Sequence, residues 1–213
     1  MVAREYGQYC GVTRALELVG ERWAMLIVRD LLVGPRRYGE LAAGLPRIPS
    51  NILAARLKEL QEAGIVRRAP RSRVIVYELT PYGRELEPVV LALGAWGFKA
   101  MGEPREQQVI TPDSMTMALR TAFQADVAEG LPPTAYAARF GPAELLVRVD
   151  GSRLDVRRGI GPADLDFAAG PEIRRLISGE LAPRHAISSG LVRVLHGPDE
   201  LLDRFASTFH LAA

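Results

Sequence analysis

Basic side chains gather between Arg36 and Arg73, where nine Arg or Lys residues stand against three Glu. The 213-residue chain as a whole has a formal net charge of only +2. A cationic side chain that neutralises a phosphate releases a condensed counterion, so this local concentration favours a nucleic-acid backbone as partner. We expect phosphate contacts from Arg36, Arg37, Arg71 and Arg73, and one of the last two is placed to reach a minor groove.

Charged turns are also commonly just solvated, so the interpretation depends on what lies beside them. Ser50, Asn51, Ala55 and Lys58 would share the N-terminal end and outer face of one helix, where side chains can meet base edges in a major groove. Asn pairs well with adenine, and Ala can contact a thymine methyl group. Arg56 lies on the flank of this helix, with a DNA backbone contact or an internal ion pair as its two roles.

The elements that must position these side chains follow in the order helix, turn, helix, strand, basic turn, strand. Helices are predicted for residues 38–43 and from Pro49 or Ser50 to Gly64, with Ser50 as an N-cap and Gly64 as the terminator. The clearest strand is Val74–Leu79, which is rich in β-branched and aromatic residues. This order is typical of a winged helix-turn-helix, which presents one helix and one hairpin to DNA.

A long helix is expected after the hairpin, opened by Thr80-Pro81 and running towards Met101. Its apolar run between Leu86 and Trp96 exceeds what a small domain buries, which indicates a dimer contact. Within the hairpin, Arg67 and Arg68 are neighbours on an alternating strand, so at most one of them would face DNA.

Groups capable of catalysis or metal binding are not clustered in this sequence. His185, His196 and His210 lack metal-ligand spacing, and no Cys or carboxylate pair accompanies them. Ser188-Ser189 does not form a nucleophile-elbow motif, and there is no glycine-rich phosphate loop. We therefore expect a protein that is not an enzyme and that has no metal and no cofactor.

Cys10 is the one thiol of the chain and precedes the first predicted helix, residues 12–19. A helix N-terminus and the nearby Arg4 and Arg14 would stabilise a thiolate, which makes Cys10 a redox candidate. A small, inert cysteine is the other interpretation. Since the chain holds no second Cys, oxidation would yield an intersubunit disulfide, a mixed disulfide or a sulfenic acid.

Charge divides the chain into two parts. Residues 1–102 hold fifteen basic and ten acidic residues, a net of +5, whereas residues 103–213 hold twelve and fifteen, a net of −3. We expect a DNA-binding and dimerisation domain at 1–102, a linker at 103–112 where apolar periodicity breaks, and a second domain at 113–213. With one Cys, no leader and no long apolar run, a cytoplasmic location without membrane contact is expected.

The second half is predicted to be α+β, with an about five-stranded, mostly antiparallel sheet backed by helices. Strands are expected at 135–140, 144–149, 153–158 and 164–167 as a meander, and at 191–195, with Asp150-Gly151 as the clearest hairpin turn. Helices are expected at 115–123, 171–178 and 198–209. Candidate pocket-lining residues are Met117, Phe123, Tyr136, Phe140, Phe167 and Phe205, each of which could instead simply fill the core.

Six segments of the first half form a recognisable set: Cys10, Leu18 to Trp23, Leu31 to Tyr38, Leu53 to Leu60, Gly64-Ile65-Val66, and Tyr77 to Gly83. In type and order they resemble the HxlR family, bacterial regulators within the wider MarR-like winged-helix group. Gly11 stands where the family commonly has Pro, and the wing is short here. The resemblance implies a dimeric DNA-binding transcription factor.

The second half resembles the sterol carrier protein-like domain. The resemblance lies in the order of its elements and in the transition from Asp164-Leu165-Asp166-Phe167 to Pro171-Glu172-Ile173. It implies a small sheet backed by helices that often encloses an apolar cavity for lipid-like ligands.

The sequence therefore predicts a homodimeric, sequence-specific transcriptional regulator, a repressor bound to a pseudo-palindromic operator in double-stranded DNA. An apolar small-molecule effector would bind in the C-terminal domain. Two alternatives stay open: a redox-responsive regulator switched through Cys10 with a structural C-terminal domain, and a lipid or metabolite carrier dimerised by its N-terminal domain.

Overall fold

The computed structural model describes residues 5–212 and has an α+β fold, as predicted. The chain separates into two compact units, Met1–Val90 and Leu91–Ala213. Within the described residues, no helix combines the length and the apolar character needed to cross a membrane.

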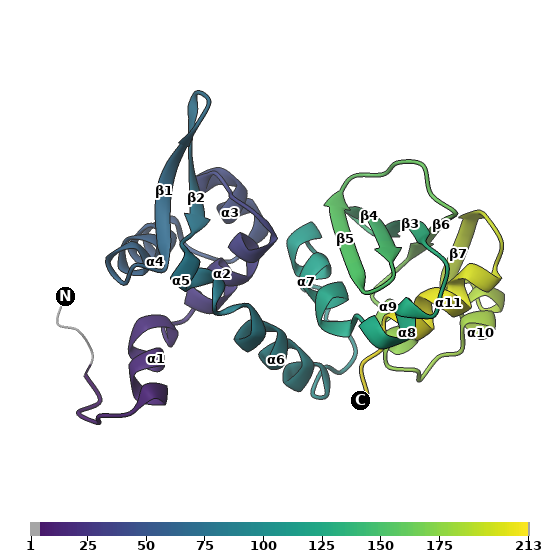
Figure 1. The fold of residues 1–213 in the computed structure, drawn as a ribbon, viewed down its shortest axis with the longest axis horizontal. Helices are drawn as coiled ribbons and strands as arrows, with labels where there is room; N and C mark the ends of the chain where they lie inside the picture. The colour runs from purple at the N-terminus through teal and green to yellow at the C-terminus, as the bar shows by residue number, and fades with distance from the viewer. Residues whose placement is uncertain (1–4, 213) are drawn as a thin grey trace. The chain divides into compact units, whose positions relative to one another are not determined.

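The first unit is a helix-turn-helix followed by a two-stranded hairpin, which confirms the predicted winged-helix order. Its helices are α1 (Gly11–Val19), α2 (Ala24–Val33), α3 (Tyr38–Gly44), α4 (Ser50–Glu62) and α5 (Pro81–Arg84), and its strands are β1 (Val66–Arg71) and β2 (Val74–Leu79). The strands pair antiparallel and rise beyond the helices (Figure 1). Buried leucines from α2, α3 and α4 lie in the interior, together with Val66, Val76 and Leu79 of the hairpin.

The long helix expected from Pro81 towards Met101 is interrupted, and that prediction was wrong. It divides into α5, which ends at Arg84, and α6 (Glu87–Phe98). Pro88 explains the break: in a continuous helix its missing N–H would leave the Arg84 carbonyl without its partner, and its ring would clash there. Thr80 caps α5 as predicted, because its hydroxyl accepts a hydrogen bond from the Gly83 N–H at 3.0 Å.

The boundary between the units lies inside α6, at Val90–Leu91, rather than at the predicted linker 103–112. The physical reason is that Phe98 belongs to the apolar core of the second unit, so the end of α6 packs with that unit. A Cβ on Gly94 would lie 3.0 Å from the Thr121 hydroxyl oxygen, which shows how close α6 comes to the following helix. Residues 101–111 contain no helix or strand.

The second unit is a five-stranded mixed sheet backed by helices. It contains α7 (Pro112–Ala122), α8 (Ala125–Glu129), β3 (Thr134–Phe140), β4 (Ala143–Asp150), β5 (Arg153–Arg158), β6 (Leu165–Ala169), α9 (Ile173–Ile177), α10 (Pro183–Ser188), β7 (Val192–His196) and α11 (Glu200–Thr208). All five strands lie within two residues of their predicted bounds, and Gly151 adopts a left-handed φ of 53° at the predicted hairpin. The short helices α8 and α10 were not predicted.

The predicted four-strand meander is wrong at its last strand. The sheet order is β5-β4-β3-β6-β7, and β6 pairs parallel with β3 instead of antiparallel with β5. Burial explains the placement: β6 buries Leu165, Phe167 and Ala169 and therefore belongs inside the sheet. β5 carries Arg153 and Arg157 and suits a solvent-facing edge.

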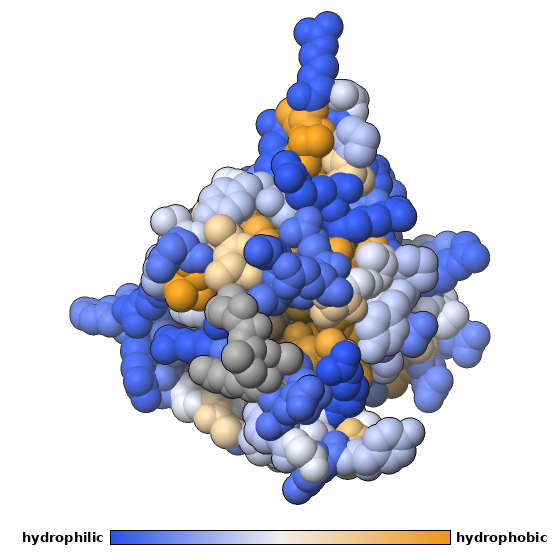
Figure 2. Space-filling view, turned by 90° about the vertical axis from the view of Figure 1, so that its left-hand side faces the viewer, coloured by the Kyte–Doolittle hydropathy of each residue, from blue (hydrophilic) through white to orange (hydrophobic). Residues whose placement is uncertain are grey.

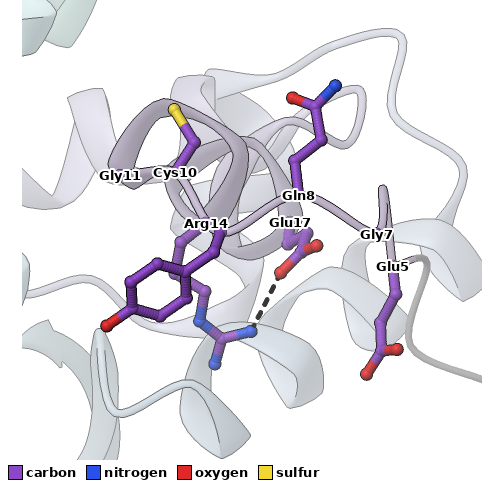
Figure 3. A pocket seen from close by; sticks show the side chains of 8 residues that line it. Glu5, Gly7, Gln8, Cys10, Gly11, Arg14 and Glu17 are labelled. Carbon is purple, nitrogen blue, oxygen red and sulfur yellow. Dashed lines mark hydrogen bonds and ion pairs between the residues drawn. The ribbon is translucent and has the colours of Figure 1, made fainter.

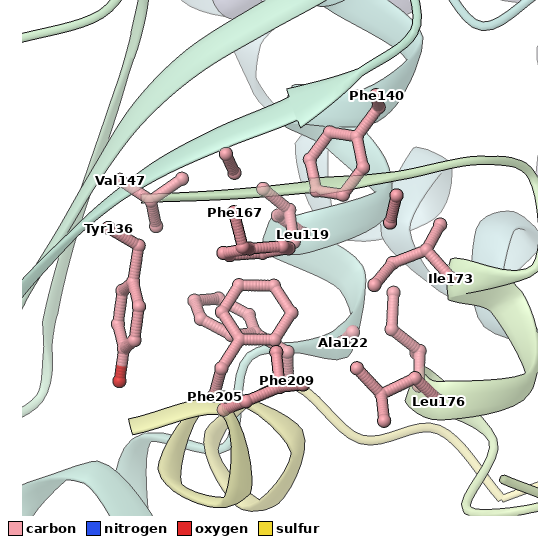
Figure 4. Packing of buried hydrophobic residues seen from close by; sticks show 14 of the residues in the cluster. Leu119, Ala122, Tyr136, Phe140, Val147, Phe167, Ile173, Leu176, Phe205 and Phe209 are labelled. Atoms are coloured by element: carbon pink, nitrogen blue, oxygen red, sulfur yellow. The ribbon is translucent and has the colours of Figure 1, made fainter. Parts of the chain in front are cut away.

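Aromatic rings from the sheet and the last helix pack directly on one another in the core of the second unit (Figure 4). The Phe205 ring lies 5.2 Å from that of Tyr136, 5.1 Å from Phe167 and 4.7 Å from Phe209, between ring centroids. Of the six predicted pocket residues, Tyr136, Phe140, Phe167 and Phe205 lie in this core, Phe123 packs against it, and Met117 is buried outside it. The ring contacts favour the core-filling interpretation for Tyr136, Phe167 and Phe205, and the pocket stays a prediction.

Candidate nucleic-acid interface

Helix α4 presents one apolar and one polar face. Leu53, Leu57 and Leu60 are buried against the rest of the first unit. On the opposite side Ser50, Asn51 and Lys58 are exposed, and Ala55 is half-buried. This is the arrangement that a recognition helix requires, because one face must anchor the helix while the other remains open to a groove.

Tyr38 fixes the start of α4 relative to α3. Its hydroxyl donates a hydrogen bond of 2.8 Å to the Ser50 carbonyl oxygen. The N-cap of α4 is Pro49 and not Ser50, so that prediction was wrong by one residue. Pro49 provides an extended backbone before the first turn, and Ser50 is already helical. The Ser50 side chain therefore does not cap the helix.

Two charged residues of α4 are engaged in ion pairs within the protein. Arg56 bonds to Glu21 at 3.0 Å and also pairs with Glu59, and only 17% of its side chain is exposed. The structure thus places Arg56 in the internal role that the sequence left open. Lys58 lies 3.7 Å from Glu62 with both side chains largely exposed, an arrangement of small energetic weight.

Arg36 and Arg37 lie between α2 and α3, beside strand β2. The backbone of Arg36 pairs with Tyr77 through hydrogen bonds of 2.9 and 2.7 Å, so this segment extends the β1–β2 ladder by one bridge. Arg36 is half-buried, and its guanidinium donates to the Pro35 carbonyl. Arg37 is exposed, and its backbone N–H donates to Glu40 at 2.6 Å at the start of α3.

The hairpin carries the remaining predicted phosphate ligands, and its tip is hydrophilic (Figure 2). Arg73 is exposed beside Ser72, which turns the chain with a φ of 54°. Arg37, Arg71 and Arg73 line one open hollow at the side of the hairpin, together with Glu40. The structure therefore brings three of the four predicted phosphate ligands to one surface.

Glu78 was not identified from the sequence, although it organises two hairpin arginines. It accepts hydrogen bonds from Arg67 at 2.9 Å and from Arg71 at 3.0 Å, and these bonds from Arg71 and Arg67 hold the pKa of Glu78 below its usual range. Arg68 lies on the other side of the strand, 6.0 Å from the Tyr77 ring. A tight turn at Ser72-Arg73 already implies a register with Arg67 opposite Glu78, so the signal was present in the spacing.

Cys10 is exposed and forms the N-cap of α1 (Figure 3). Hydrogen bonds from the backbone N–H groups of Thr13 and Val12 lower the pKa of the Cys10 thiol, with a further contribution from the Thr13 hydroxyl. Arg14 is paired with Glu17 at 3.2 Å, and Arg4 lies outside the described residues. Among the described residues, the N–H groups at the start of α1 are thus the main cause of the lowered pKa of this thiol.

Residues 18–105 match the family model described as HxlR-like helix-turn-helix. The chain is 44% identical over 96 residues to the HTH-type transcriptional regulator Rv3095 of Mycobacterium tuberculosis (strain ATCC 25618 / H37Rv), covering 44% of this chain and 60% of the relative. It is 40% identical over 85 residues to the HTH-type transcriptional regulator YodB of Bacillus subtilis (strain 168), covering 38% of this chain and 76% of YodB.

Solved structures that resemble the chain include the quinone-bound YodB from B. subtilis, with 38% identity over 41% of this chain and 96% of that one at a TM-score of 0.38. Another is the redox regulator HypR in its oxidised form, with 32% identity over 45% of this chain, all of that chain and a TM-score of 0.41. Each of these four matches covers less than half of this chain. Through this shared part, the chain belongs to the HxlR-like helix-turn-helix family of transcriptional regulators.

Proposed function

We propose that this protein is a homodimeric transcriptional repressor that binds a pseudo-palindromic operator in double-stranded DNA. The observation that carries the proposal is the exposed polar face of α4 beside the basic hairpin in a single compact unit. Asn51 and Ser50 would read base edges, and Ala55 would contact a thymine methyl group. Arg37 and Arg73 would bind phosphate and set the position of the helix in the groove, whereas Arg71 would contribute little while Glu78 holds it.

The dimer is supported by the apolar surface of α6. Val89, Leu93 and Trp96 are 47%, 49% and 74% exposed, which is unusual for large apolar side chains in a monomer. Pairing of two such surfaces would give the twofold symmetry that a palindromic site requires. The two recognition helices would then lie about 34 Å apart, one turn of the double helix.

Selection from a random-sequence DNA pool at two salt concentrations tests the repressor proposal. We expect enrichment of an inverted repeat with one-turn spacing between half-sites. Retention of DNA without an enriched motif would reduce the proposal to sequence-independent binding. Leu93→Glu tests the dimer, since a buried charge on that surface should yield a monomer by light scattering, whereas Glu85→Gln, an exposed change before α6, should leave the oligomeric state unchanged.

Control by an apolar small molecule through the second unit would require a binding site on that unit. The Tyr136 and Phe205 rings are in contact, so a ligand between them would have to bind a state in which they separate, or bind elsewhere on the unit. It would shift DNA binding only if it bound the DNA-competent and incompetent states unequally. A lipid or metabolite carrier would leave the α4 face and the basic hairpin without a role.

A second candidate is a redox-responsive regulator switched through Cys10. The exposed position of the thiol and its lowered pKa favour this candidate, because exposure gives an oxidant access and a lower pKa increases the fraction of reactive thiolate. Loss of operator binding after peroxide treatment, restored by a thiol reductant and absent in Cys10→Ser, would support it. Equal loss in the variant would exclude Cys10 as the switch.

A further inference from the structure

The hairpin holds two of its arginines on its own carboxylate. Arg67 donates a hydrogen bond of 2.9 Å through Nε to one oxygen of Glu78, and its terminal nitrogen lies 2.8 Å from the same oxygen as an ion pair. Arg71 donates to the other oxygen at 3.0 Å. The Glu78 side chain is only 9% exposed, whereas those of Arg67 and Arg71 are 62% and 61% exposed. The carboxylate thus lies beneath two guanidinium groups that reach solvent.

The Arg71 side chain points from the turn back towards the base of the hairpin. Arg71 ends β1 beside the turn, directly opposite Val74, yet its side chain reaches back to Glu78, which pairs with Arg67 four residues nearer the base. The three side chains carry a combined charge of +1 instead of the +2 of two unpaired arginines. Arg68 and Arg73 have no contact with Glu78 among the described interactions. Both side chains are exposed, so their positive charges stay open to a partner.

We propose that Glu78 restrains the sequence-independent affinity of this protein for DNA by holding Arg67 and Arg71 away from phosphates. The inference rests on the proposed DNA-binding function. A phosphate contact by either arginine must replace a hydrogen bond to a largely buried carboxylate. The loss of that bond cancels most of the binding free energy that the phosphate contact would give. Binding to arbitrary DNA depends almost entirely on such backbone contacts, whereas an operator also supplies base contacts to α4.

The opposite role would be that Glu78 orients the two arginines towards phosphate. The two roles predict changes of opposite sign when the carboxylate is neutralised. Restraint predicts tighter binding and a steeper dependence on salt. Orientation predicts weaker binding, because the arginines lose their fixed geometry.

Glu78→Gln keeps the size of the side chain and removes its charge. We expect the affinity for a fluorescein-labelled 30-base-pair duplex of arbitrary sequence to rise about fivefold to tenfold at 0.1 M salt for each recovered phosphate contact. The slope of log affinity against log salt should steepen by about 0.9 for each contact. Glu85→Gln is the matched control, because it makes the same change in net charge outside the hairpin and should leave the slope unaltered.

Arg71→Gln provides a test that does not depend on folding of the Glu78 variant. If Glu78 already holds Arg71, the loss of Arg71 should change duplex affinity in the wild-type background by less than about twofold. In the Glu78→Gln background it should remove the share of the gain that one recovered contact gives, and leave the share of Arg67. Weaker or unchanged binding by a folded Glu78→Gln protein, or a tenfold loss in Arg71→Gln alone, would overturn the inference. Absence of salt-dependent duplex binding by the wild type would instead refute the proposed function.

Discussion

In the first unit, polar and charged side chains of α4 and of the β1–β2 hairpin stand at the surface over a small leucine-rich interior. In the second unit, the large aromatic side chains turn inward, and their rings contact one another from β3, β6 and α11. The first unit therefore exposes groups that can meet a charged partner. In the second unit the largest side chains pack against one another in the interior.

Residue type alone indicates a binding site in the first unit but not in the second. Basic residues on a helix and a hairpin stay exposed because burial of a charge without a partner is costly. Aromatic residues in an alternating strand are buried whether they line a pocket or fill a core. Exposed basic residues therefore indicate a binding surface, whereas buried aromatic residues do not distinguish a pocket from a packed core.

Opening the aromatic core should produce the largest effect. Phe205→Ala removes a fully buried ring that contacts three others, so we expect the free energy of unfolding of the second unit to fall by about 3–5 kcal/mol. Chemical denaturation followed by circular dichroism measures the change. A loss below about 1 kcal/mol would indicate spare space around the ring and would revive the ligand-pocket interpretation.

Alkaline pH should weaken the same core. Burial raises the pKa of Tyr136 to about 12, so the folded protein keeps this hydroxyl protonated where an unfolded chain, with a tyrosine pKa near about 10, would release the proton. The stabilisation is complete below about pH 10 and is lost as pH rises towards 12, by up to about 3 kcal/mol. Unfolding measured between those values should show a shallower decline in Tyr136→Phe, and identical curves would assign the decline to other groups.

Base reading by α4 should show a smaller effect that depends on sequence. Asn51→Ala should cost about 1–3 kcal/mol on the selected operator and relax the preference at particular base pairs. Repeating the selection with the variant reveals which positions lose information. A uniform loss over all sequences would place Asn51 among the backbone contacts instead.

Phosphate binding beside the hairpin should show an effect without sequence preference. Arg37 is exposed on the surface that also carries Arg73, so Arg37→Ala should weaken binding to every duplex and reduce the salt slope by about 1. Titrations at several salt concentrations measure both quantities. Unchanged affinity and slope would remove Arg37 from the interface.

The smallest expected effect concerns the reactivity of Cys10. Since backbone hydrogen bonds lower the pKa of this thiol, its thiolate fraction at neutral pH should exceed that of an ordinary cysteine, whose pKa is about 8.5. The rate of alkylation by iodoacetamide should therefore reach half its maximum at a lower pH than for glutathione. A midpoint at or above that of glutathione would favour the inert interpretation.

Much of the candidate site was predictable because local rules determine it. The leucine spacing placed Asn51 and Lys58 on the outer face of α4, and Gly64 ended that helix with a left-handed φ of 69°. Internal partners were harder to predict. Arg56 bonds to Glu21, which is 35 residues away, and no local pattern indicates such a contact.

Residue types along the chain were enough to predict the helix-turn-helix, the hairpin and the five strands of the second unit, but not the short helices α8 and α10. Helix caps, alternating strands and tight turns depend on neighbouring residues, so they can be read along the chain. The tertiary structure alone decided that β6 pairs with β3, that the second unit takes up the end of α6, and that its aromatic residues fill the core. These outcomes depend on contacts between segments that are distant in the sequence, so no short stretch of residues specifies them.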